Sequence, residues 1–132
     1  MILADTSAWI EFRRATGSAV HLRLRTAVET RESLVTTGVV VMELLAGARD
    51  EQDAEALRRL LARCRFLPLE EPWDDEVAAS IYRACRREGA TVRRMTDCLI
   101  AAVAIRCGAR VLHRDADFDV IARHSALALE AA

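Results

Sequence analysis

Short apolar runs alternate with longer stretches of helical periodicity along this chain of 132 residues. In the longer stretches apolar residues recur at helical spacing, as at Val20, Leu24 and Val28, which predicts helices with one buried face. The predicted helices cover residues 6–14, 18–31, 39–47, 50–63, 72–88 and 97–107, with a helical turn at 118–121. The short runs between them predict strands at residues 2–4, 34–36, 66–69, 109–112 and 126–130.

This alternation of strand and helix is typical of an α/β fold, with a mostly parallel sheet of four to five short strands flanked by helices. The helix at residues 39–47 is almost wholly apolar, so we expect it to be buried. Pro68 has no N–H for a ladder hydrogen bond, so its run indicates a sheet edge or the end of a strand. The chain length suits a single domain over residues 1–132.

The composition, with 52% apolar and 30% charged residues, is typical of a soluble globular protein and argues against a disordered chain. The first apolar run stops at Asp5, which disfavours a signal peptide, and the apolar run 98–105 is shorter than the ~20 residues of a membrane span. The four cysteines form no CxxC pair, which favours reduced thiols over a zinc site or a disulfide framework. We therefore expect a cytoplasmic protein without a membrane partner.

Acidic residues stand where the predicted elements meet. Asp5 ends the first strand, Asp97 opens an apolar helix, and Asp115 and Asp117 follow the strand at 109–112. Because ligand-binding crevices in α/β folds lie at the carboxyl ends of the strands, we expect these acids to meet at one edge of the sheet.

Glu43, inside the apolar helix at 39–47, is a further candidate. A carboxylate in apolar surroundings is costly unless it is paired, protonated or bound to a cation. Structural alternatives remain open for two of the acids. Glu43 can pair with an arginine such as Arg49 or occupy an exposed helix edge, and Asp5 can cap the helix that follows it.

Carboxylates that gather at one place repel each other, and a cation relieves that repulsion. Oxygen-only ligands favour hard ions, meaning Mg²⁺ or Mn²⁺. One or two such ions can activate a water and stabilise the leaving oxygen of a phosphodiester. His113 and His124 lie near the acids in sequence, but this chemistry does not require them, and we interpret them as surface or packing residues. The sequence therefore predicts metal-dependent phosphodiester hydrolysis.

Four short motifs contain these acids: Asp5-Thr6-Ser7, Val41-Met42-Glu43-Leu44-Leu45-Ala46-Gly47, Asp97-Cys98-Leu99-Ile100-Ala101-Ala102 and Asp115-Ala116-Asp117-Phe118. Together, in this order and spacing over essentially the whole chain, they resemble the motifs of PIN-domain ribonucleases, and more narrowly those of VapC-type toxins of bacterial toxin–antitoxin pairs. There is one departure: His113 stands where many relatives carry a threonine, which leaves open how the loop at Asp115 is held.

The resemblance implies a PIN-like fold and an endoribonuclease that cuts RNA, such as tRNA or rRNA, with Mg²⁺ or Mn²⁺. The residues that it assigns to the catalytic metal site are Asp5, Glu43, Asp97, Asp115 and, as an assisting ligand, Asp117. Thr6 resembles the family's hydroxyl beside the first aspartate, which orients a carboxylate or a metal-bound water. The expected partners are a second copy of the chain, forming a homodimer, and a cognate VapB-type antitoxin.

All 19 basic residues are arginine, and the chain has no lysine. A biased genome composition can produce this, but the planar guanidinium also suits phosphate recognition. The densest basic stretch runs from Arg83 to Arg94, just before Asp97. We expect Arg93 and Arg94 to contact RNA phosphates, with a solvated helix surface as the structural alternative. The absence of lysine also excludes a P-loop NTPase.

Two other function classes remain as alternatives. Phosphoryl transfer through a covalent aspartate, as in haloacid-dehalogenase-like phosphatases and receiver domains, also begins at a strand followed by aspartate, but it normally needs a nearby lysine. A PIN-like module that binds RNA or protein without cutting is the second alternative, which the presence of all four acids disfavours. For the nuclease we hypothesise that Asp5, Asp97 and Asp115 hold the ion, and that Glu43 helps to bind it or orients the attacking water.

Overall fold

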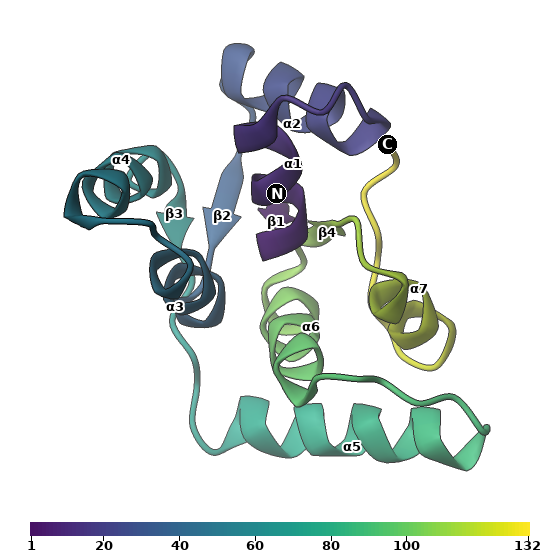
Figure 1. Ribbon diagram of the computed structural model, residues 1–132. Helices are drawn as coiled ribbons and strands as arrows, with labels where there is room; N and C mark the ends of the chain where they lie inside the picture. Colours follow the sequence, from purple (N-terminus) through teal and green to yellow (C-terminus); the bar gives the residue numbers. More distant parts are fainter.

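A parallel sheet of four short strands forms the centre of the computed structural model, which describes residues 1–132 (Figure 1). The sheet order is β3-β2-β1-β4. The strands are β1 (Ile2–Ala4), β2 (Leu34–Thr36), β3 (Arg65–Phe66) and β4 (Arg110–Leu112). Leu3 pairs with Val35 on one side and Val111 on the other, and all three are fully buried. Central strands that are buried on both faces are expected for a parallel sheet covered by helices.

Seven helices surround the sheet, and the predicted α/β fold is confirmed. They are α1 (Thr6–Arg14), α2 (Ala19–Glu29), α3 (Gly38–Ala46), α4 (Glu51–Leu61), α5 (Trp73–Arg87), α6 (Met95–Cys107) and α7 (Ala116–Arg123). α2 packs against α1, and α5 packs against α6, as Figure 1 shows. No helix is both long enough and apolar enough to cross a membrane.

The order of the strands reverses between β1 and β4. The chain moves from β1 to β2 and β3 on one side of β1, whereas α5 and α6 then carry it to β4 on the other side. Past the last pair of the ladder, the Asp5 N–H still donates to the Leu112 carbonyl oxygen at 2.9 Å, so the two strand ends lie side by side. Ligands of open α/β sheets bind at such a switch point, beyond the carboxyl ends of the strands.

Helix α6 is buried around most of its circumference, including every residue from Ile100 to Ala104. It packs against α5, α7, α3 and β4. Its alanines, among them Ala101 and Ala102, allow these neighbours to approach closely, and dense packing of this kind leaves the helix little freedom to move. α6 therefore holds Asp97, in its first turn, at a fixed place.

The structure shortens two predicted strands. β3 ends at Phe66; the Leu67 N–H still donates to the Thr36 carbonyl at 2.8 Å, but Pro68 has no N–H to continue the ladder. The strand predicted at 126–130 is wrong as a strand, because only an isolated bridge between Val111 and Leu129 forms. The helical turn predicted at 118–121 is part of a longer helix, α7.

The prediction that residues 39–47 are buried is wrong in part. Only Val40 and Leu44 of α3 are buried, and Met42 is 58% exposed. The reason is that α3 packs on one side against α4, α6 and α1, which leaves its other side open. Glu43 consequently lies at a helix edge, with 18% of its side chain exposed.

Gly108, between α6 and β4, gives a test of this connection. Its φ is +69°, in the left-handed region, where an L side chain is strained. Nothing lies within 4 Å of a Cβ built there, so Gly108→Ala introduces backbone strain without a clash. We expect it to lower the free energy of unfolding by about 1 kcal/mol. Urea titration measures the change, and an unchanged midpoint would contradict this account of the turn.

Candidate active site

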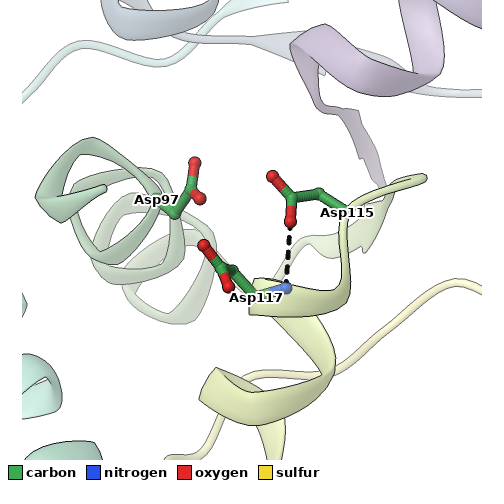
Figure 2. A group of neighbouring side chains, drawn as sticks. All are labelled: Asp97, Asp115 and Asp117. Atoms are coloured by element: carbon green, nitrogen blue, oxygen red, sulfur yellow. Dashed lines mark hydrogen bonds between the residues drawn. The ribbon is translucent and has the colours of Figure 1, made fainter. Parts of the chain in front are cut away.

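Three carboxylates meet beyond the carboxyl end of β4. Asp97 lies in the first turn of α6, Asp115 is the N-cap of α7, and Asp117 lies in the first turn of α7. Each is buried, and each offers one oxygen such that all three oxygens lie within 4.8 Å of one another. Figure 2 shows the three side chains converging, with the Asp117 N–H donating to Asp115 Oδ1 at 3.0 Å. A single cation can contact all three.

Asp5 reaches the same region from the end of β1. Its Oδ2 accepts hydrogen bonds from the Ser7 N–H at 3.0 Å and from the Ser7 hydroxyl at 2.6 Å, so the helix-capping interpretation is confirmed. Its Oδ1 is buried and has no hydrogen-bond partner. Capping therefore accounts for one oxygen of this carboxylate and leaves the other unsatisfied.

Asp97 has the most perturbed acidity in the cluster. Burial, with the negative charges of Asp5 and Asp115 adding to it, raises the pKa of Asp97 to about 7. Burial also raises the pKa of Asp5, and the charge of Asp115 adds a smaller effect. Asp97 Oδ2, like Asp5 Oδ1, is buried without a hydrogen-bond partner. The Ser7 hydrogen bonds to Asp5 and the positive charge of Arg94 near Asp97 are therefore too weak to offset burial, and the charge of both carboxyl groups is only partly compensated.

Asp115 and Asp117 are compensated by the two arginines that precede α6. Arg93 Nη2 donates to Asp115 Oδ1 at 2.9 Å and Arg94 Nη2 donates to Asp115 Oδ2 at 3.1 Å, while the Arg93 backbone N–H donates to Asp117 Oδ2 at 3.0 Å. Burial alone would raise the pKa of Asp115, but the Asp117 N–H and the two guanidinium groups outweigh it and hold that pKa below its usual value. Both arginine side chains remain largely exposed, at the rim of the acids.

Glu43 is held by two side chains, of which Arg94 also contacts the cluster at Asp115. The Thr6 hydroxyl donates to Glu43 Oε1 at 3.0 Å, as expected of a hydroxyl that orients a carboxylate. Glu43 Oε2 lies 3.6 Å from Arg94 Nη1. The alternative that Glu43 pairs with an arginine is thus confirmed, but the partner is Arg94. Arg49 lies instead near Asp53, with 3.6 Å between its Nη2 and the carboxylate.

Ser7 and His113 support the site in ways that the sequence did not predict. The Ser7 hydroxyl, besides donating to Asp5, accepts the Arg114 N–H at 2.9 Å and so ties the end of β1 to the loop after β4. His113 Nδ1 accepts the Asp115 N–H at 3.1 Å, and its ring packs on Phe118. Packing is therefore only part of the role of His113. Its position two residues before Asp115 was the available signal.

His113 variants can separate these two roles. Asparagine places an oxygen acceptor near the position of Nδ1, so His113→Asn keeps a partner for the Asp115 N–H, whereas His113→Leu leaves that N–H unsatisfied. We expect His113→Leu to weaken Mn²⁺ binding about tenfold, as for other residues that support a metal ligand, and His113→Asn to restore most of it. Isothermal titration measures the affinities. Equal losses in both variants would show that the ring matters only through packing.

The cluster fits a divalent cation. Its donors are all carboxylate oxygens, which suit a hard ion. Five carboxylates of the predicted site face only two guanidinium groups, and two buried oxygens, Asp5 Oδ1 and Asp97 Oδ2, have no partner. Because an unpaired buried charge is costly, this arrangement favours a bound cation.

The PIN-domain family model matches residues 2–124 of the chain. Ribonuclease VapC11 of Mycobacterium tuberculosis is 50% identical over 124 residues, which are 93% of this chain and 92% of that protein. The fold is similar to chains in crystal structures of VapBC2 from Rickettsia felis (TM-score 0.77, 19% identity, 98% of each chain) and of VapBC from Salmonella typhimurium (TM-score 0.76, 21% identity, 98% of this chain and 96% of that one). With its acids at the switch point and these matches over nearly its full length, the chain belongs to the PIN-domain family and, within it, to the VapC ribonucleases.

Proposed function

We propose that this chain is a divalent-metal-dependent endoribonuclease that acts as the toxin of a toxin–antitoxin pair, with residues 1–132 as a single PIN domain. The observation that carries the proposal is the convergence of acids from separate elements at the switch point of the sheet, with two buried oxygens unsatisfied. Membership of the VapC ribonucleases supports RNA as the substrate. One hydrophobic core of 31 buried residues supports the single domain.

The proposed metal ligands are Asp97, Asp115 and Asp117, with Asp5 completing the set from β1. When bound, Mg²⁺ or Mn²⁺ supplies a Lewis acid that polarises the phosphodiester and lowers the pKa of water. Glu43, held by the Thr6 hydroxyl, either helps to bind the ion or orients the attacking water by accepting a hydrogen bond from it.

Arg93 and Arg94 are the proposed contacts to the scissile phosphate. Their exposed guanidinium groups lie against the acids and can turn toward a phosphate without unfolding any helix. In doing so, each arginine exchanges a carboxylate of the cluster for a phosphate of the substrate as its partner.

A VapB-type antitoxin and a second copy of the chain are the proposed protein partners. The structural neighbours named above were solved as VapBC assemblies, which supports a VapB-type partner. The exposed Met42 on α3 supports burial of that side in a homodimer. Light scattering on the purified chain tests the dimer. Loss of cleavage upon addition of a cognate VapB-type antitoxin tests the pairing.

The proposed activity is tested by incubating a mixed tRNA and rRNA pool with purified, antitoxin-free protein. We expect discrete cuts with Mg²⁺ or Mn²⁺, no cuts in EDTA, and no cuts by Asp5→Asn under either ion. A folded wild-type protein that cuts nothing with either ion would favour the non-cutting binding module. Cleavage that survives Asp5→Asn would place the active site elsewhere.

A further inference from the structure

A cleft lies beside Glu43, between α1 and the turn from α3 to α4. It has a volume of about 490 Å³, and its lining is mostly polar. Three of the residues that line it are arginines: Arg13 and Arg14 at the end of α1, and Arg49 just before α4. The acid cluster carries a net negative charge. The guanidinium groups of the cleft carry the opposite charge, so the two sites differ in the ligands that they attract.

Two residues of the proposed active site also line the cleft. Thr6 and Glu43, which are hydrogen-bonded to each other at 3.0 Å, line the cleft, and Glu43 also faces Arg94 and through it Asp115. Along α1, Arg13 lies about 10 Å from Thr6, since the helix rises ~1.5 Å per residue. A strand bound at the acids covers this distance within a few nucleotides.

Asp53 organises the basic end of the cleft. It is 8% exposed, it pairs with the Arg13 guanidinium, and it accepts the Arg49 N–H at 3.0 Å. The closest side-chain partner of this carboxylate is Arg13, and Arg49 is the second. Arg14 has no ion pair, and the Arg49 side chain is 84% exposed, with 3.6 Å to its nearest carboxylate oxygen. Arg13, Arg14 and Arg49 face only two carboxylates in this lining, Asp53 and Glu43, and Glu43 also pairs with Arg94, so the cleft keeps positive charge for an anion.

We propose that this cleft binds a backbone phosphate of the RNA strand on one side of the scissile bond, through Arg14 and Arg49. The inference rests on the proposed ribonuclease function and adds a path for the substrate. A strand that lies on the acids is repelled by them, and the cleft supplies positive charge on the Glu43 side, from the unpaired Arg14 and the exposed Arg49. Arginine is suited to this contact because its planar fork donates two hydrogen bonds to one phosphate.

The observations favour RNA over an acidic peptide as the occupant. The cleft is lined in part by Thr6 and Glu43 of the proposed active site, and only 2 of its 9 lining residues are hydrophobic. A cluster of arginines can hold the carboxylates of an acidic peptide as well as the phosphates of RNA. What favours RNA is that Thr6 and Glu43, which belong to the proposed nuclease site, line the same cleft.

The test measures RNA binding by the full-length chain with Asp97→Asn as background, in EDTA, so that no strand is cut. A fluorescein-labelled single-stranded RNA is titrated at several salt concentrations. Arg14→Gln combined with Arg49→Gln is compared with Arg59→Gln combined with Arg123→Gln. The control pair removes the same charge from two exposed arginines that form no ion pair and lie outside the cleft.

We expect the cleft variant to bind about tenfold more weakly at low salt, and the slope of log K against log salt to fall by about 0.7 for each RNA phosphate that the variant no longer binds. The control pair should change neither quantity. An unchanged slope in the cleft variant, while wild-type protein still cuts the RNA pool, would overturn the cleft and leave the proposed function standing. RNA binding like that of the background together with loss of antitoxin binding would overturn it in favour of a protein-docking site. Wild-type protein that cuts no RNA would instead overturn the proposed function.

Discussion

Replacing Asp97 with asparagine is expected to abolish RNA cleavage and, at the same time, to make the metal-free protein more stable. The loss of activity follows from the place of Asp97 among the acids, where its oxygen lies within 4.8 Å of those of Asp115 and Asp117. An amide cannot supply the negative charge that a cation requires, so we expect cleavage to fall by about 10²–10³-fold or more. Cleavage of a defined RNA under saturating Mn²⁺ measures this loss.

The gain in stability follows from the acidity of the same group. Burial raises the pKa of Asp97 in the folded state to about 7, from an ordinary value of 3.8. Between these two values the folded state holds a proton that the unfolded chain has released, so stability falls as the pH rises from about 4 to about 7. Asparagine removes this loss, and it also removes repulsion with Asp5 and Asp115. We expect a Tm increase of at least roughly 3–5 °C in EDTA at pH 8, and a smaller one at pH 5.

A matched variant makes this result specific to the cluster. Asp75→Asn changes an exposed carboxylate on α5 that forms no ion pair, so it should alter neither cleavage nor the pH dependence of Tm. If Asp97→Asn instead lowered Tm at pH 8, the ionised Asp97 carboxylate would have to make stabilising interactions in the folded protein. An active Asp97→Asn enzyme would remove it from the catalytic site. An increase in stability on loss of a functional group is the usual mark of a strained active site.

The sequence was most informative where a local pattern and a rule of topology pointed the same way. Short apolar runs followed by acids predicted parallel strands with carboxylates at their ends, and Asp5 and Asp115 do follow β1 and β4. The strand order between them requires the crossover through α5 and α6, and no local pattern encodes it. That Asp97 joins them depends on how α6 packs in the core.

The errors in prediction come from packing at a distance. The apolar composition of α3 indicated burial, but the elements around it cover only one of its sides, so Met42 is exposed. The run at 126–130 has the composition of a strand, yet it meets β4 at a single bridge. Neighbouring elements decide both outcomes, and the residues of the segment itself do not reveal them.

The partners of the acids were also beyond the sequence. Asp115 is held by His113 from its own loop and by Arg93 and Arg94 from the segment before α6. Proximity in sequence suggested Arg49 for Glu43, although a helix edge reaches whichever arginine the fold brings near, here Arg94. Residue types alone identify which charges need compensation, but the fold decides which groups supply it.

Mn²⁺ is expected to stabilise the protein strongly, and more so at pH 8 than at pH 6. An ion that binds only the folded state at a hundred times its Kd adds about 2.7 kcal/mol to the free energy of unfolding. In a chain of this length that corresponds to a rise in Tm of roughly 10 °C. Thermal unfolding with and without Mn²⁺, each against an EDTA control, measures the effect. No stabilisation by Mn²⁺ or Mg²⁺ at pH 8 would contradict a metal site at these acids.

The pH dependence arises because the ion competes with a proton. With a pKa of about 7, Asp97 is largely protonated at pH 6 and largely ionised at pH 8. A metal ligand must be deprotonated, so the apparent affinity for Mn²⁺ should be about tenfold weaker at pH 6, with release of close to one proton on binding at that pH. Titration calorimetry in two buffers of different ionisation enthalpy counts that proton. In the Asp97→Asn variant the affinity for Mn²⁺ should be low and nearly independent of pH over this range. A wild-type Kd that is equal at both pH values would instead mean that Asp97 is already ionised before the ion binds.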